Sequence, residues 1–316
     1  MNYGLPYKGS KNLIADKLLG YMPGGDVFVD LFCGGCAMTH AAMVQHKYKR
    51  YIVNDINPIC PTLFYDAIMG KYSGERRWVS REEFNSSTDP YVKFCWSFGN
   101  NLTDYMYHNE IEPYKRACHY AVVFDQWSEL QRLCPEVWET AKQALDGVTS
   151  IKERRLKFGP SIIKWLKSNG SAGMVASNLL YRSAHWRGGF PGNKRSDLQS
   201  LESLQSLERL NKNYWEVDIP DGAIVYCDIP YKGTDGYTDA EFDHSRFYGW
   251  FRSLPHPAFL SEYAAPFTCV AEINHRSRLS AKNNTGVTEK LFFNGTMADY
   301  NKLMNTSNAR LLSMWG

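Results

Sequence analysis

The segment Asp228-Ile229-Pro230-Tyr231 combines residue types that could activate an amine. The Asp228 carboxylate and the Ile229 carbonyl could each accept one N–H of an exocyclic amine, which would aim the nitrogen lone pair at an electrophile. Pro230 fixes its own φ and has no N–H to donate, so it would hold the direction of that carbonyl. Tyr231 could stack on a base turned out of a duplex. A β-turn with a buried tyrosine is the alternative interpretation, because such four-residue strings are common.

A glycine-containing segment earlier in the chain, from Asp30 through Phe32 and Gly34 to Cys36, could bring the backbone close to a ligand. Twenty residues after Gly35 comes Asp55, where a carboxylate can accept hydrogen bonds from both hydroxyls of a ribose. The pair favours a cofactor that contains adenosine, and a structural turn with a helix-capping aspartate is the alternative. A dinucleotide fits these two features equally well. A nicotinamide oxidoreductase is disfavoured because the full Gly-x-Gly-x-x-Gly pattern is absent.

The elements expected to position these residues form a β-α-β unit and a later continuation of the same sheet. Parallel strands of a doubly wound sheet place ligands at their carboxyl ends, which is where Asp30, Asp55 and Asp228 would lie. The predicted strands are residues 26–32, 50–54, 223–227 and 268–273, with a helix over 37–43 and a helix or turn starting at Asn57-Pro58.

Between these two parts, residues 60–175 mix aromatic and polar side chains without strand-like alternation. We interpret this stretch as an inserted, mostly helical domain, with helix-compatible spacing over 112–146. The expected boundaries are 1–58 plus 176–316 for a discontinuous catalytic domain and 59–175 for the insert. A basic cluster at 152–157 is compatible with a phosphate contact or with a solvated helix face.

A glycine-rich, basic and aromatic segment, residues 182–195, has the composition of a loop that meets nucleic acid, although a plain loop fits equally. Its candidate phosphate contacts are Arg182, Arg187, Lys194 and Arg195. The leucines that follow recur every three residues from Leu198 to Leu210. On an α-helix this step winds around the axis, so it predicts a packed helix and not a dimerising zipper.

Composition sets broad limits on the class of protein. The 316 residues leave room for two units, and 44% hydrophobic with 22% charged residues is ordinary for a globular protein. A net charge of +3 is too small to indicate a polyanion partner by itself, so any surface that binds nucleic acid must be a local basic patch. No segment resembles a membrane span or a signal peptide, and we expect a cytoplasmic protein. The eight cysteines are expected to be free thiols, with zinc or redox chemistry at Cys33 and Cys36 as the alternative.

Taken together, these motifs resemble the Dam-like family of N6-adenine DNA methyltransferases, particularly its phage-borne members, over most of the chain. Tyr7 and Lys11 resemble the family's amino-terminal motif, in which an aromatic residue and a lysine flank the methionine part of S-adenosylmethionine. The remaining correspondences are Asp30-x-Phe32-x-Gly34 with the glycine motif, Asp55 with the ribose-binding acid, and Asp228 to Tyr231 with the Asp-Pro-Pro-Tyr catalytic motif.

The resemblance implies a Rossmann-like, S-adenosylmethionine-dependent α/β domain whose insert is the target-recognition domain. Asp218 would match the acid that meets the adenine amine of the cofactor, and Asp228 would also contact the cofactor. Two positions depart from the family pattern. Ile229 replaces the first proline but keeps a carbonyl, and Cys36 stands where glycine is usual, which is expected to alter the turn.

The expected activity is direct in-line transfer of a methyl group to the N6 amine of an adenine flipped out of double-stranded DNA. No metal, covalent enzyme intermediate or obligatory protein partner is implied. Methylation of cytosine N4 or of adenine in RNA needs the same acceptors and remains an alternative. A DNA-binding relative that has lost methyl transfer is a second alternative, suggested by Ile229 and Cys36.

Overall fold

The chain folds into two compact units. A computed structural model of the chain describes residues 3–5, 9–72, 74–169, 206–231, 242–276 and 286–315. We call Met1–Ser73 with Pro191–Gly316 the sheet unit, and Gly74–Phe190 the helical unit. Each is described by itself below.

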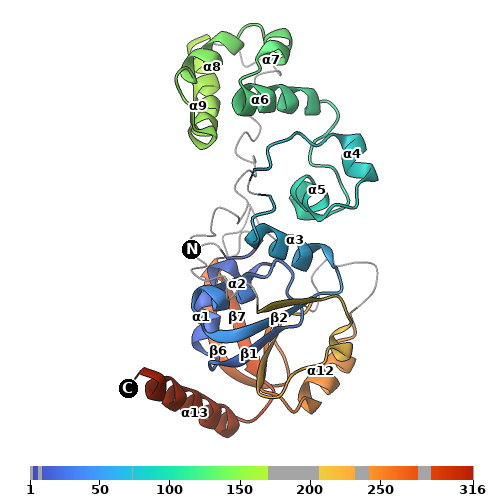
Figure 1. Cartoon of the computed structure of the whole chain (residues 1–316), viewed down its shortest axis with the longest axis vertical. Helices are drawn as coiled ribbons and strands as arrows, with labels where there is room; N and C mark the ends of the chain where they lie inside the picture. Colours follow the sequence, from blue (N-terminus) through green and yellow to red (C-terminus); the bar gives the residue numbers. More distant parts are fainter. Residues whose placement is uncertain are drawn as a thin grey trace. The chain divides into compact units, whose positions relative to one another are not determined.

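The described residues of the sheet unit contain seven strands, which form one sheet in the order β3-β2-β1-β4-β5-β7-β6 (Figure 1). The strands β1 to β5 pair in parallel, whereas β7 runs antiparallel to both of its neighbours. This is a Rossmann-like α/β fold, and the predicted fold class is confirmed. The strands are β1 (Gly25–Asp30), β2 (Tyr48–Asn54), β3 (Leu207–Leu210), β4 (Ala223–Cys227), β5 (Ala258–Glu262), β6 (Thr268–Arg276) and β7 (Gly286–Phe293).

Helices cover both faces of this sheet. Alternate side chains of β1 and β4, including Val29 and Val225, pack with Phe247 and Phe251 of α12 in one buried cluster. On the opposite face, the β1 side chain Asp30 contacts Thr39 of α2. The helical segments of this unit are η1 (Lys11–Leu13), α1 (Ala15–Gly20), α2 (Ala37–Val44), α3 (Ile59–Ile68), η5 (Tyr214–Glu216), α12 (His244–Ser253) and α13 (Met297–Trp315).

Two details of the sheet unit differ from the sequence prediction. The division between the units falls after residue 73 instead of 58, because α3 belongs with the sheet, where Arg209 of β3 lies 4.2 Å from the centre of the Tyr65 ring. Leu207 and Leu210 lie in β3 and not in a helix. This strand is at the edge of the sheet and is defined by its parallel pairing with β2, which a three-residue leucine step does not reveal. The leucines from 198 to 204 lie outside the described residues.

In the helical unit, helices α6 to α9 enclose their own hydrophobic core, which includes Val122, Leu130 and Phe158. Arg154, within the basic cluster of the sequence, is a structural residue. Its guanidinium donates hydrogen bonds to the carbonyls of Ala121 and Val122 near the end of α6. The elements are α4 (Arg81–Ser86), α5 (Pro90–Cys95), η2 (Phe98–Asn100), α6 (Glu112–Phe124), α7 (Ser128–Leu133), α8 (Trp138–Ala144) and α9 (Ile151–Asn169).

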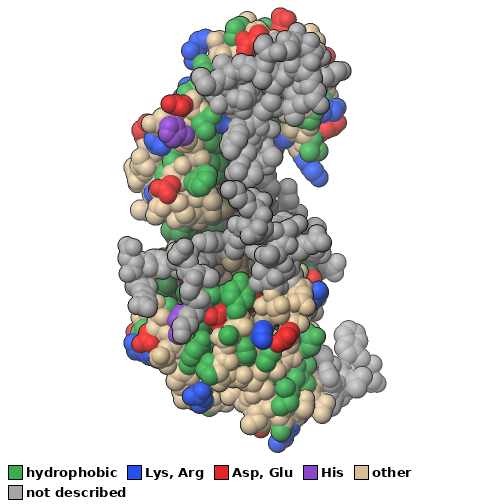
Figure 2. All heavy atoms as spheres, turned by 180° about the vertical axis from the view of Figure 1, so that it is seen from behind, with side chains coloured by type: hydrophobic (Ala, Val, Ile, Leu, Met, Phe, Trp, Pro, Cys, Tyr) green, Lys and Arg blue, Asp and Glu red, His purple; other side chains and the backbone are tan. Residues whose placement is uncertain are grey.

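The described surface carries charges of both signs. On the face shown in Figure 2, lysine and arginine side chains are interspersed with aspartate and glutamate. This pattern agrees with the small net charge of +3. In the part of the chain that the structure describes, no helix is long and apolar enough to span a membrane.

Candidate active site

The candidate site lies where the strand order reverses, between β1 and β4. These two strands pair in parallel, with Asp30 at the last position of β1 in register with Tyr226 of β4. Asp228 follows one residue after the end of β4. The carboxyl ends of two neighbouring strands therefore present an aspartate each, at the place where doubly wound sheets bind ligands.

Asp228 is paired with Lys11, which belongs to the amino-terminal motif. Its Oδ1 lies 2.7 Å from Lys11 Nζ, and Lys11 also donates a hydrogen bond to the Gly9 carbonyl. Burial raises the pKa of Asp228 to about 6, although the Lys11 ammonium opposes this effect. For Lys11, burial alone would lower the pKa, but the carboxylates of Asp228 and Glu289 outweigh it and raise the pKa. The structure thus brings together two segments that are far apart in sequence.

Tyr231 is held on several sides. Its hydroxyl donates a hydrogen bond to Glu289 Oε1 on β7. The Lys11 ammonium lies over the ring, 4.7 Å from its centre, and the Tyr263 ring packs edge-on at 4.6 Å. These three contacts fix the position of the Tyr231 ring.

Ile229 and Pro230 are fixed by the core and by α12. The Ile229 side chain is buried in the cluster beneath the sheet, which explains why an isoleucine is accommodated at this position. The Pro230 carbonyl lies 2.9 Å from Nε2 of His244, the first residue of α12. The backbone that carries the Ile229 carbonyl is therefore anchored on both sides.

Asp30 is buried, and its two carboxylate oxygens differ in their hydrogen bonding. Thr39 donates a hydrogen bond of 2.7 Å to Oδ2. Oδ1 accepts no hydrogen bond from the described residues, and the same holds for the buried oxygens Ser10 Oγ and Asn12 Oδ1 beside Lys11. Burial raises the pKa of Asp30 to about 7, and the nearby charge of Asp228 adds to the rise. Buried acceptors are nearly always satisfied, so these oxygens are candidate acceptors for hydrogen bonds from a ligand.

Asp55 ties the glycine turn to the end of β2. Its Oδ2 accepts a hydrogen bond from the Gly34 N–H and its Oδ1 accepts one from the Asn57 N–H. Burial raises the pKa of Asp55, and these two hydrogen bonds oppose the rise. A carboxylate has about four lone-pair positions, so capacity remains for ribose hydroxyls.

Phe32 and Cys36 serve the shape of the turn between β1 and α2. The Phe32 ring packs 5.3 Å from Tyr214 and 5.7 Å from Phe247, within the aromatic cluster under α12. Cys36 adopts the left-handed conformation, with φ of 56°, which explains why glycine is usual at this position. Burial raises the pKa of both Cys33 and Cys36, so each is a thiol at neutral pH.

The amino-terminal segment is docked on the same turn through Gly4. The Gly4 N–H donates to His40 Nδ1, and the Leu5 N–H donates to the Gly35 carbonyl. Gly4 has a φ of 63°, and a Cβ added there would lie 2.3 Å from the Gly35 oxygen. This contact requires glycine and places Lys11 near the ends of β1 and β4.

Some predicted site residues are not part of this described cluster. Tyr7 lies outside the described residues, as do the candidate phosphate contacts Arg182, Arg187, Lys194 and Arg195. Asp218 is exposed in the segment that leads into the amino end of β4. Their functional roles stay predictions.

Two residues that contact the site were missed from the sequence. Glu289 lies on β7 in a segment with no recognisable motif. Thr39 lies within α2, where nothing in the sequence distinguishes it from the other small residues of the helix. Residues 286–293 place two charged residues side by side and then three apolar ones, so no alternating pattern predicts the strand or a glutamate that faces Lys11. All eight cysteines are free, and the described residues contain no group of three or more potential metal ligands.

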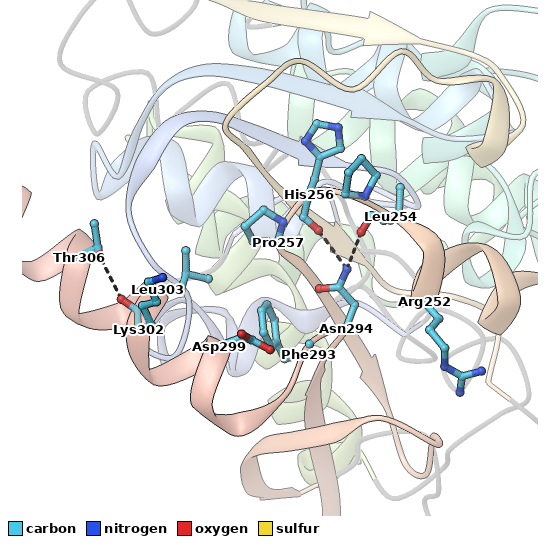
Figure 3. Close-up of a pocket in the computed structure, with 12 residues that line it drawn as sticks. Arg252, Leu254, His256, Pro257, Phe293, Asn294, Asp299, Lys302, Leu303 and Thr306 are labelled. Atoms are coloured by element: carbon cyan, nitrogen blue, oxygen red, sulfur yellow. Dashed lines mark hydrogen bonds between the residues drawn. The ribbon is translucent and has the colours of Figure 1, made fainter.

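A cavity of about 440 Å³ lies elsewhere in the sheet unit, between the amino end of β5 and α13 (Figure 3). The Asn294 side chain in its wall donates to the carbonyls of Leu254 and His256 and accepts from the Ala258 N–H. These contacts fix the entry to β5. The cavity lies at the amino end of β5, whereas Asp228 follows the carboxyl end of the parallel strand β4, so the two are at opposite ends of these strands.

Comparison with known proteins gives one family. The family described as D12 class N6 adenine-specific DNA methyltransferase matches residues 7–126. The matched span contains Lys11, the glycine turn and Asp55, while Asp228 lies beyond it and joins the site through the fold. No curated protein sequence matches the chain. Over residues 7–126 the chain is therefore similar to D12 class N6 adenine-specific DNA methyltransferases, and its Rossmann-like sheet agrees with that similarity.

Proposed function

We propose that the protein transfers a methyl group from S-adenosylmethionine to the N6 amine of an adenine that is turned out of double-stranded DNA. The observation that carries this proposal is the placement of Asp228 and the Ile229 carbonyl directly after β4, beside Asp30 at the end of β1. An acceptor pair for an amine then adjoins a set of groups suited to a cofactor.

The described residues fit S-adenosylmethionine in charge and in hydrogen bonding. The carboxyl groups of Asp30, Asp228 and Glu289 outnumber the Lys11 ammonium in this part of the site, which favours a ligand with more positive than negative groups. The unsatisfied oxygens Asp30 Oδ1 and Asn12 Oδ1 are acceptors that an α-ammonium group could satisfy. Asp55 would receive the ribose hydroxyls, and Tyr7, Lys11 and Asp218 are further proposed contacts.

When bound, S-adenosylmethionine supplies a methyl group on a positively charged sulfur. The chain's own residues prepare the nucleophile. Asp228 and the Ile229 carbonyl each accept one N–H of the adenine amine, so that the nitrogen lone pair leaves the ring and faces the methyl group. The new N–C bond forms as the S–C bond breaks, and the nitrogen then loses one proton, which the Asp228 carboxylate can accept. Tyr231 orients the base by ring contact.

Binding to DNA is proposed to use the helical unit for target recognition and Arg182, Arg187, Lys194 and Arg195 for phosphates. Phosphate contacts release counterions, so affinity should fall as salt rises. Replacing one of these side chains by alanine should reduce the slope of log affinity against log salt by about one. An unchanged slope in all four variants would remove the phosphate assignment.

The experiment that tests the function is methyl transfer followed by product analysis. Duplex DNA is incubated with the protein and S-adenosylmethionine labelled in the methyl group, and the DNA is digested to nucleosides. We expect label in N6-methyl-2′-deoxyadenosine, and we expect Asp228→Ala to abolish labelling while duplex binding persists. Label in N4-methyl-2′-deoxycytidine, or transfer of label to RNA, would replace the substrate assignment. Cofactor binding without transfer to any nucleic acid would instead favour a relative that has lost catalysis.

A further inference from the structure

Glu289 is a buried carboxylate at the candidate site that no sequence motif contains. It lies on β7, opposite Ile273 of β6, and is 2% exposed. Burying a charged group is costly unless partners compensate. Two such partners are the Tyr231 hydroxyl, which donates a hydrogen bond to Oε1, and the Lys11 ammonium, whose Nζ lies 3.9 Å from the same oxygen.

These contacts connect Glu289 to both reactive parts of the Asp228 to Tyr231 segment. The Tyr231 ring is attached through its hydroxyl. Asp228 is attached through Lys11, whose Nζ is 2.7 Å from Asp228 Oδ1 and also lies over the Tyr231 ring. Glu289 thus lies on a strand of the sheet and contacts Lys11 at the start of η1 and Tyr231 in the loop after β4.

We propose that Glu289 is a positioning residue, whose carboxylate fixes the Tyr231 ring and the Lys11 ammonium so that the base-binding ring and the Asp228 carboxylate keep their places at the end of β4. Its effect on catalysis rests on the proposed function, whereas its effect on Lys11 does not. A buried hydrogen bond to a charged group is more rigid than a solvated one, and small displacements of reacting groups are costly to rate.

The first test compares three variants of the full chain. Glu289→Gln keeps an acceptor for Tyr231 but removes the charge, and Glu289→Met removes both. We expect kcat to fall by about 10-fold in the first and about 100-fold in the second, with KM for DNA changed by less than about 3-fold. Glu272→Gln removes an exposed carboxylate from the neighbouring strand β6 and should leave kcat unchanged. If Glu289→Gln retains wild-type kcat, the proposal is overturned.

A pH profile separates positioning from a general loss of folded protein. The Glu289 charge raises the pKa of Asp228, whereas the hydrogen bond from Tyr231 lowers this pKa. Glu289→Gln should therefore shift the acid limb of the kcat profile to lower pH than in the wild type. Tyr231→Phe should shift this limb to higher pH. Fewer folded molecules would lower the profile without shifting it, and that result would contradict the proposal. The groups that face Asp228 are Lys11, Asp30, Tyr226, Cys227, Tyr231, Tyr263 and Glu289.

A measurement on the ligand-free protein needs no methyl transfer. Lys11 is labelled with acetic anhydride over a range of pH, and mass spectrometry of the peptide gives its apparent pKa. Because Glu289 raises the pKa of Lys11, Glu289→Gln should lower it, while Glu272→Gln should not. An unchanged Lys11 pKa in Glu289→Gln would overturn the proposed contact even in an active enzyme. A wild-type protein without methyl transfer would refute the proposed function and leave this result standing.

Discussion

Ionisation of Asp30 should make the ligand-free protein less stable as the pH rises. Asp30 is 1% exposed, and burial raises its pKa from 3.8 to about 7. The folded chain therefore binds a proton in a pH range where the unfolded chain has already lost it. The stabilisation is complete below pH 4 and disappears as the pH rises through 7. With these two pKa values, the ionisation of Asp30 lowers the free energy of unfolding by about 2.5 kcal/mol between pH 5 and pH 8.

Asp30→Asn removes the ionisation but keeps an oxygen that can accept the Thr39 hydrogen bond. The free energy of unfolding of the variant, minus that of the wild type, should therefore increase by about 2.5 kcal/mol between pH 5 and pH 8. Taking the difference cancels the titration of groups common to both proteins.

The assay must report on the sheet unit alone, because the chain has two compact units. Hydrogen exchange of peptides from β1 and β4, followed over a urea series at each pH, meets this requirement. Thr39→Val serves as a control that keeps Asp30 but removes its donor, and it should make the pH dependence steeper. A difference between Asp30→Asn and wild type that is flat from pH 5 to pH 8 would refute the reasoning.

Two further substitutions test how the units are built. Gly4→Ala should detach the amino-terminal segment, because the new Cβ would collide with the Gly35 oxygen. The free energy of unfolding should fall by about 3 kcal/mol, and proteolysis near residue 10 should become faster. A variant that resists proteolysis as well as the wild type would contradict this contact. Arg154→Met should destabilise the helical unit by about 3 kcal/mol, because it leaves the carbonyls at the end of α6 without their donor. Lys157→Met, on the exposed side of α9, is its control and should change stability by less than about 0.5 kcal/mol in urea denaturation.

The strands next to the motifs could be predicted because their patterns are local. Residues 223–227 are an uninterrupted apolar run ending at Asp228, and β4 has the same bounds. The strand predicted over 268–273 is confirmed as the first part of β6. β5 and β7 were missed. Each mixes apolar with polar or charged residues, and β5 buries Ser261 and Glu262 along with its apolar side chains.

Individual residues of the candidate site could be predicted from sequence motifs, but the contacts between distant segments could not. Sequence motifs predicted Lys11, Asp30, Asp55 and Asp228 as site residues, and their roles stay predictions. The ion pair between Lys11 and Asp228 spans more than 200 positions in the chain, and no local pattern in the sequence predicts it. The proposed role of Glu289 rests on the antiparallel placement of β7 beside β5, which no local pattern determines.

The requirement for Asp228 as an amine acceptor is tested most directly in cells that express either the wild-type chain or Asp228→Asn. Genomic DNA from both is sequenced by a method that detects modified bases. N6-methylated adenines within a defined sequence in the wild-type cells, and their absence in cells with equal amounts of folded Asp228→Asn protein, are the predicted result. The same methylation in both would contradict the account.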